Sequence, residues 1–181
     1  MSNLKKLNWP NLTLLFLMSF GVMNVWGRPA MSVLTVNTPD QAGYVQWAES
    51  SGPAIGESID AAVGGTCIPV AGYYAPGELY YWHLYGDHAT AMGSVPYNPT
   101  IMSELKKQTV DRVVSRSDAY SVLLAEPVDY SVGDTFSNWN IVVSTTDPQK
   151  YLQSVKRMSA AASENGLEDI RLAVYSYLTG E

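Results

Sequence analysis

Two stretches of the sequence, Val36–Gln46 (VNTPDQAGYVQ) and Val143–Gln153 (VSTTDPQKYLQ), carry one pattern at a spacing of 107 residues. Both read Thr-x-Asp-x-x-x-Tyr, followed by Val or Leu and then Gln. In each stretch a β-branched run is followed by a Thr and an Asp that suit a helix N-cap, and a helical pattern comes next. The sequence therefore predicts an internal repeat of two strand–helix units that begin in the same way.

The first unit is predicted to span residues 31–127 and to have the order strand, helix, strand, strand, helix, strand. β-branched and aromatic runs predict the strands, and apolar residues at helical spacing predict the helices. Gly52-Pro53 should break or kink the first helix. The expected ranges are a strand at 32–37, a helix within 40–63, a hairpin of strands 66–74 and 79–85, a helix at 100–114 and a strand at 119–125.

The second unit, residues 136–181, repeats only the opening of the first. It is predicted to contain a strand at 139–144, an alanine-rich helix at 147–165 that stops at Gly166, and a strand at 170–178. The match ends where the first unit enters its hairpin turn. We therefore expect a partial second copy, with an open sheet edge that a partner covers.

This element order resembles the dimeric α+β barrel group of the ferredoxin-like folds, which includes antibiotic-biosynthesis monooxygenase-like proteins. The resemblance implies an α+β fold: a ferredoxin-like βαββαβ unit, then a partial βαβ copy, with antiparallel sheets packed as an α+β barrel. It also implies a homodimer and a cavity between the sheets, which members of the group use for oxygenation, isomerisation or haem binding. A shared fold does not determine the chemistry, so the activity must be argued from residues.

Composition excludes several classes of protein. The 181 residues are 46% hydrophobic and 15% charged, which is enough apolar material for a folded core. The net charge of −6 argues against a nucleic-acid partner, because phosphate binding needs clustered cations. The one cysteine, Cys67, allows neither an intramolecular disulfide nor a thiolate zinc cage. As a lone cysteine it is expected to be a small buried hydrophobe.

The N-terminus is predicted to be a signal peptide over residues 1–27. Lys5 and Lys6 precede an apolar run from Leu12 to Val25, which is shorter than a membrane-spanning helix. The mature protein is then periplasmic or secreted, with no membrane segment left after cleavage. The alternative is a translation start at Met31, which would leave the protein in the cytoplasm.

The aromatic strand at 79–85 supplies the candidate site. Side chains alternate along a strand, so Tyr81, His83 and Tyr85 share one face. We expect the purely aliphatic faces to lie under helices and the aromatic faces to meet between two sheets. The residues expected to line that space are Tyr73, Tyr81, His83, Tyr85, Trp139, Arg171 and Tyr175.

Two functions follow from this lining. The first is binding of a small apolar or aromatic ligand, in a cofactor-independent and monooxygenase-like manner, with His83 as the acid or base. The second is a non-catalytic module whose aromatic face is a homo-oligomer interface. No metal and no cofactor is expected, because His83 and His88 are the only histidines and do not share a helix face. Asp87 and His88 are expected to be structural.

Overall fold

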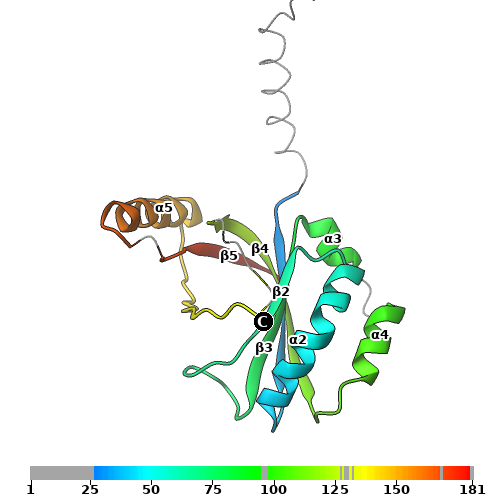
Figure 1. The fold of residues 1–181 in the computed structure, drawn as a ribbon. Helices are drawn as coiled ribbons and strands as arrows, with labels where there is room; N and C mark the ends of the chain where they lie inside the picture. The colour runs from blue at the N-terminus through cyan, green and yellow to red at the C-terminus, as the bar shows by residue number, and fades with distance from the viewer. Residues whose placement is uncertain are drawn as a thin grey trace, which may run out of the picture.

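The computed structural model describes residues 27–94, 98–126, 128, 131, 133–167 and 169–179. These residues form a mixed α+β fold with a five-stranded antiparallel sheet and four helices (Figure 1). The strands are β1 (Ala30–Asn37), β2 (Val63–Cys67), β3 (Glu78–Tyr85), β4 (Val113–Ala125) and β5 (Ala173–Thr179). The helices are α2 (Gln41–Ser58), α3 (His88–Gly93), α4 (Pro99–Lys106) and α5 (Pro148–Glu164). The predicted signal peptide lies outside the described residues, apart from Gly27.

The strand order is β2-β3-β1-β4-β5, so β1 is the central strand and β2 and β5 are the end strands. All four neighbouring pairs are antiparallel, and the order of the first four strands is compatible with a ferredoxin-like fold. β5 belongs to the predicted second unit but pairs with β4 of the first. The described residues thus form one open sheet, and the expected barrel of two sheets packed face to face is not found within them.

Four elements differ from the sequence-based expectations. The first strand of the hairpin, expected at 66–74, is β2 at Val63–Cys67 and shares only two residues with the expected range. The helix expected at 100–114 ends at Lys106, because Val113 and Val114 belong to β4 and pair with Asn37 and Val36 of β1. The expected strand at 139–144 pairs with no other described strand. Helix α2 continues through Pro53, where a break was expected.

The two repeated stretches begin their helices in the same way. Asp40 Oδ1 accepts a hydrogen bond from the Gly43 backbone N–H at 2.8 Å, and Asp147 Oδ1 accepts one from Lys150 at 2.9 Å. A threonine hydroxyl two residues earlier accepts from the backbone N–H of each aspartate, at 3.2 and 3.1 Å. The predicted equivalence of Asp40 and Asp147 as N-caps is confirmed.

The core lies between α2 and the central strands. Val36 of β1 and Leu79 of β3 are fully buried opposite each other, and Tyr44 and Trp47 of α2 pack over them in the same cluster. In Figure 1, α2 and α4 lie together on one side of the sheet, whereas α5 lies apart from them near β4 and β5. One face of the sheet is therefore covered by α2, and α3 also packs on β1 and β3.

The N-caps give a direct test of the repeat. We expect Asp40→Ala and Asp147→Ala each to lower the free energy of unfolding by about 0.5 to 2 kcal/mol, because each leaves a helix N–H without its side-chain acceptor. Urea unfolding followed by circular dichroism measures the change. Gln149→Ala, in the first turn of α5, is the control and should change the free energy of unfolding by less than about 0.5 kcal/mol. Equal effects of Gln149→Ala and Asp147→Ala would contradict the capping role.

Candidate functional site

The side chains of Tyr81, His83 and Tyr85 lie beneath the helices and not between two sheets. Tyr81 is 7% exposed, and its ring packs 6.4 Å from that of Tyr44 and 6.2 Å from that of Trp47, both on α2. The expectation that this set faces a second sheet is therefore wrong. The cause is that β3 carries apolar side chains on both faces, so alternation separates the two sets without saying which one the helices cover.

His83 lies in an apolar part of this covered face. Its ring is 4.8 Å from that of Tyr81 and 6.3 Å from that of Tyr85. It also lies directly against Gly64 of β2, where a Cβ atom would come within 2.5 Å of the imidazole. Burial lowers the pKa of His83 to about 4, so the imidazole is neutral near pH 7. The Tyr81 hydroxyl beside it is buried without a hydrogen-bond partner among the described residues.

Asp87 and His88 have structural roles. The Asp87 carboxylate accepts a hydrogen bond from the Thr90 backbone N–H at 2.8 Å and caps α3, and this bond holds the pKa of Asp87 below its usual value. His88 Nε2 lies 3.1 Å from the Ser121 hydroxyl on β4. The expectation that these two residues are structural is confirmed.

The opposite face of the sheet, here called the open face, is aromatic. Side chains that pair across neighbouring strands lie on the same face, so the register defines its rows. One row contains Val63, Leu84, Met31, Tyr120 and Tyr177. The next contains Gly65, Trp82, Val33 and Asp118, and a third contains Cys67, Tyr80 and Thr35, beside Arg116.

Polar groups stand at the centre of this aromatic surface. The Arg116 guanidinium donates to the Asp118 carboxylate at 2.8 Å, and the Asp118 side chain is only 4% exposed. Next to this ion pair, the rings of Tyr120 and Tyr177 lie 4.8 Å apart. Burial raises the pKa of Tyr120, and the hydrogen bond to Tyr177 raises it further. The Tyr120 phenol is therefore neutral near pH 7 and can donate a hydrogen bond.

Trp82 occupies the other half of the open face. Its indole lies over Gly65, where a Cβ atom would come within 3.0 Å of the ring. The consecutive glycines of β2 thus make room for two rings of β3 on opposite faces, His83 over Gly64 and Trp82 over Gly65. The nearby Cys67 is half-buried and not the fully buried hydrophobe that was expected, and partial burial raises the pKa of its thiol.

The remaining predicted site residues are dispersed. Tyr175 lies on the open face, where its ring is 6.4 Å from that of Tyr120. Tyr73 is 56% exposed in the loop between β2 and β3, and Trp139 is 90% exposed in an extended segment. Arg171, also exposed, precedes β5. Sequence reasoning missed Arg116, Asp118 and Tyr120, although their alternation on one strand could have indicated a shared face.

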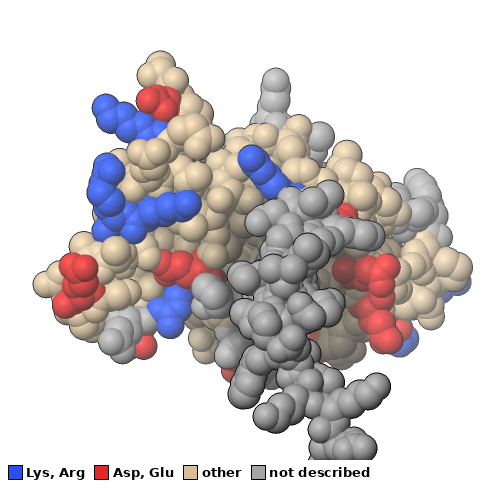
Figure 2. Space-filling view, turned by 90° about the horizontal axis from the view of Figure 1, so that it is seen from above, with Lys and Arg blue, Asp and Glu red and all other residues tan. Residues whose placement is uncertain are grey.

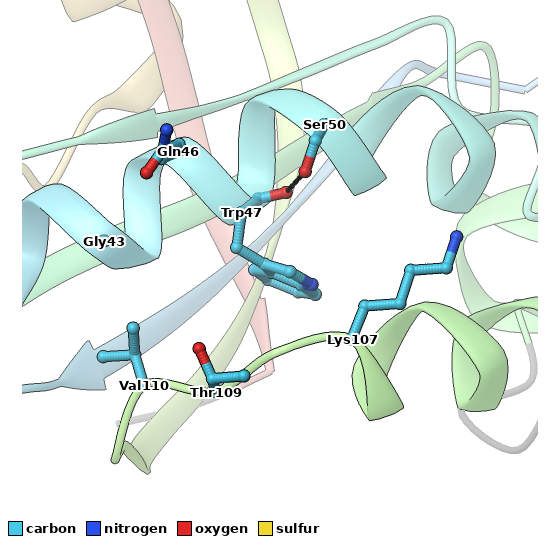
Figure 3. A pocket seen from close by; sticks show the side chains of 7 residues that line it. All are labelled: Gly43, Gln46, Trp47, Ser50, Lys107, Thr109 and Val110. Carbon is cyan, nitrogen blue, oxygen red and sulfur yellow. Dashed lines mark hydrogen bonds between the residues drawn. The ribbon is translucent and has the colours of Figure 1, made fainter.

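A pocket lies away from the open face, between α2 and the segment that follows α4 (Figure 3). Its volume is about 340 Å³. The Trp47 indole forms part of its wall and donates to the Glu104 carbonyl at 3.1 Å. Its cation, Lys107, already pairs with the Glu104 carboxylate at 2.6 Å. The lining residues are Gly43, Gln46, Trp47, Ser50, Lys107, Thr109 and Val110.

In the part of the chain that the structure describes, no group of three or more His, Cys, Asp or Glu side chains could hold a metal ion. No helix there is both long and apolar enough to cross a membrane.

No protein-family model matches the sequence, and no curated protein matches it either. The open face, with its rings around the Arg116–Asp118 ion pair, is the candidate functional surface.

The environment of His83 predicts how stability depends on pH. An unfolded histidine has a pKa near 6.5, so lowering it to about 4 in the fold makes protonation favour the unfolded chain. This contribution to stability is intact above pH 6.5 and is lost as the pH falls toward 4. We expect a loss of about 2 kcal/mol between pH 7 and pH 5.

The measurement is urea unfolding at both pH values for the native chain and for His83→Phe, which keeps a flat ring that does not titrate. His88→Phe is the matched control. The difference in the free energy of unfolding between pH 7 and pH 5 should be smaller by about 2 kcal/mol in His83→Phe, and should change less in His88→Phe. An unchanged difference in His83→Phe would mean that the imidazole takes up a proton as readily in the folded chain as in the unfolded chain, which would contradict the lowered pKa.

Proposed function

We propose that the protein is a homodimeric module in which the open faces of two copies pack against each other. The observation that carries the proposal is the unequal cover of the two sheet faces. Helices α2 and α3 pack on one face, and α4 packs on α2. The other face bears the half-buried aromatic side chains of Tyr80, Trp82 and Tyr120 and the exposed side chains of Tyr175 and Tyr177.

The physical argument is the cost of leaving this surface in water. A soluble monomer rarely exposes a large contiguous apolar patch, and aromatic rings supply much of the energy of known interfaces. Tyr175 and Tyr177 are 41% and 51% exposed. The charged groups Arg116 and Asp118 are paired with each other, so they do not present an isolated charge to a second copy.

Packing of two open faces also accounts for features expected from the sequence. It would bring two sheets face to face, as in the α+β barrel that the chain resembles, with the second sheet supplied by a second chain. Export to the periplasm or outside the cell remains part of the proposal, and the argument for it is the N-terminal sequence alone.

A second candidate function is binding of a small apolar or aromatic ligand between the two sheets. The observation that favours it is the group of polar atoms within the aromatic surface. The hydroxyls of Tyr120 and Tyr177 and the Arg116–Asp118 pair could orient a flat ligand held between rings. In this version the monooxygenase-like chemistry would take place on the open face, whereas His83 lies on the covered face.

The dimer is tested with a charge placed on the open face. Tyr177→Lys should raise the dimer dissociation constant at least about tenfold, because burying an unpaired ammonium is unfavourable. Sedimentation equilibrium of the native chain and the variant measures it, with circular dichroism to verify folding. Met102→Lys on α4, where Met102 is 41% exposed, is the control and should leave dimerisation unchanged. A native chain that stays monomeric at every concentration would overturn the proposal.

Ligand binding is tested separately by native mass spectrometry of the dimer purified from its own cell compartment. A bound small molecule should add a constant mass to two chains and should be lost or weakened in Tyr120→Phe, which removes one hydroxyl. Tyr73→Phe is the control, because Tyr73 lies in the loop outside the sheet. A dimer whose mass equals that of two chains would contradict a tightly held ligand and favour the non-catalytic module.

A further inference from the structure

Residues 135–146, here called the arm, lie between β4 and α5 and contain the expected strand at 139–144. In the described structure the arm is extended and belongs to no strand. Its apolar side chains point largely into solvent: Trp139 is 90% exposed, Ile141 76% and Val142 82%. Four of the five residues Trp139–Val143 have high β-propensity, Asn140 being the exception, and the segment pairs with no described strand. Such a segment readily pairs with a sheet edge.

The repeat indicates the structure that this segment suits. At the constant spacing of 107 residues, Ile141 and Val143 correspond to Leu34 and Val36 of β1. β1 is the central strand of the sheet, and Val36 is fully buried there. The arm is followed by the same N-cap arrangement as β1, so its sequence is that of a sheet strand without a neighbouring strand.

Phe136, near the start of the arm, contacts the open face close to the end strand β2. The ring of Phe136 lies 6.5 Å from that of Trp82 on the open face, and Trp82 covers Gly65 of β2. β2 spans Val63–Cys67, so its free edge matches the length of Trp139–Val143. Each chain therefore carries both a free edge and a segment of matching length, so two copies can supply these to each other reciprocally.

Charge does not oppose a second copy at these two segments. The chain has a net charge of −6, so two copies repel each other except where their surfaces are uncharged. Residues 61–77, which include β2, contain no charged side chain, and neither do residues 135–146. In the view from above, Lys and Arg side chains gather at the left, where Figure 1 places α5 (Figure 2). The proposed contact thus joins the two segments at which like charges do not meet.

We propose that the arm of each copy adds as a strand to the free edge of β2 in the other copy. The inference rests on the proposed dimer and adds to it a reciprocal exchange of strands. It gives backbone partners to both the arm and the edge of β2. It also buries Trp139 together with Ile141 against the partner, since side chains two residues apart on a strand point to the same face.

The single native cysteine makes this testable by cross-linking, because Cys67 lies at the end of β2. Single cysteines are placed at Asn140, Ile141, Val142 and Val143 in the full chain, which is then oxidised with copper phenanthroline and examined on a non-reducing gel. A disulfide requires Cα atoms within about 7 Å. We expect a covalent dimer at one position or at alternate positions, with peptide mapping showing Cys67 joined to the new cysteine.

Two controls define the outcomes. Cys67→Ser in the linking variant should abolish the bond to β2, and Met158→Cys on α5 should not cross-link to Cys67. A Cys67 bond within one chain would place the arm on its own β2 and overturn the exchange. A native chain that is dimeric by sedimentation but gives no bond at any of the four positions would overturn the exchange while leaving the dimer. A monomeric native chain would overturn both.

Discussion

The two-sided apolar character of β3 is the constraint on which this structure depends. The strand reads ELYYWHLY and places Leu79 and Tyr81 on one face and Tyr80 and Trp82 on the other. Tyr44 and Trp47 of α2 pack on the first face and form the hydrophobic core together with its side chains. Because α2 and α3 pack only on that side, the second face needs cover from outside the sheet, and the proposals of self-association and of a strand exchange both follow from that need.

Local signals in the sequence predicted local structure well. The Asp at each helix start and the apolar spacing after it predicted α2 and α5, since capping depends on residues only three apart in the chain. Which strands pair with each other was not predictable in the same way. The spacing of Val113 and Val114 fits the apolar face of a helix, but both residues pair with β1. Pairing with a distant strand cannot be read from the neighbouring residues in the sequence.

The candidate site was half predictable for a related reason. Alternation correctly separated Tyr81, His83 and Tyr85 from Tyr80, Trp82 and Leu84, but the choice of covered face depends on which set α2 meets. Leu79 shares a face with Tyr81 and opposes Val36, and this aliphatic pair was the available signal. Tyr175 was expected to line one space with Tyr81, but it lies beside Tyr120 on the open face, whereas Tyr81 lies on the face that α2 covers.

The central claim, that two copies pack through the open face, is tested most directly by hydroxyl-radical footprinting at low and high protein concentration. Tyr175 and Tyr177 on the open face and Trp139 in the arm should become protected at high concentration. Met92 and Met158, which are 66% and 58% exposed on α3 and α5, should react equally at both. Equal oxidation of Tyr175, Tyr177 and Trp139 at both concentrations, in a sample shown to be dimeric at the higher one, would contradict the account.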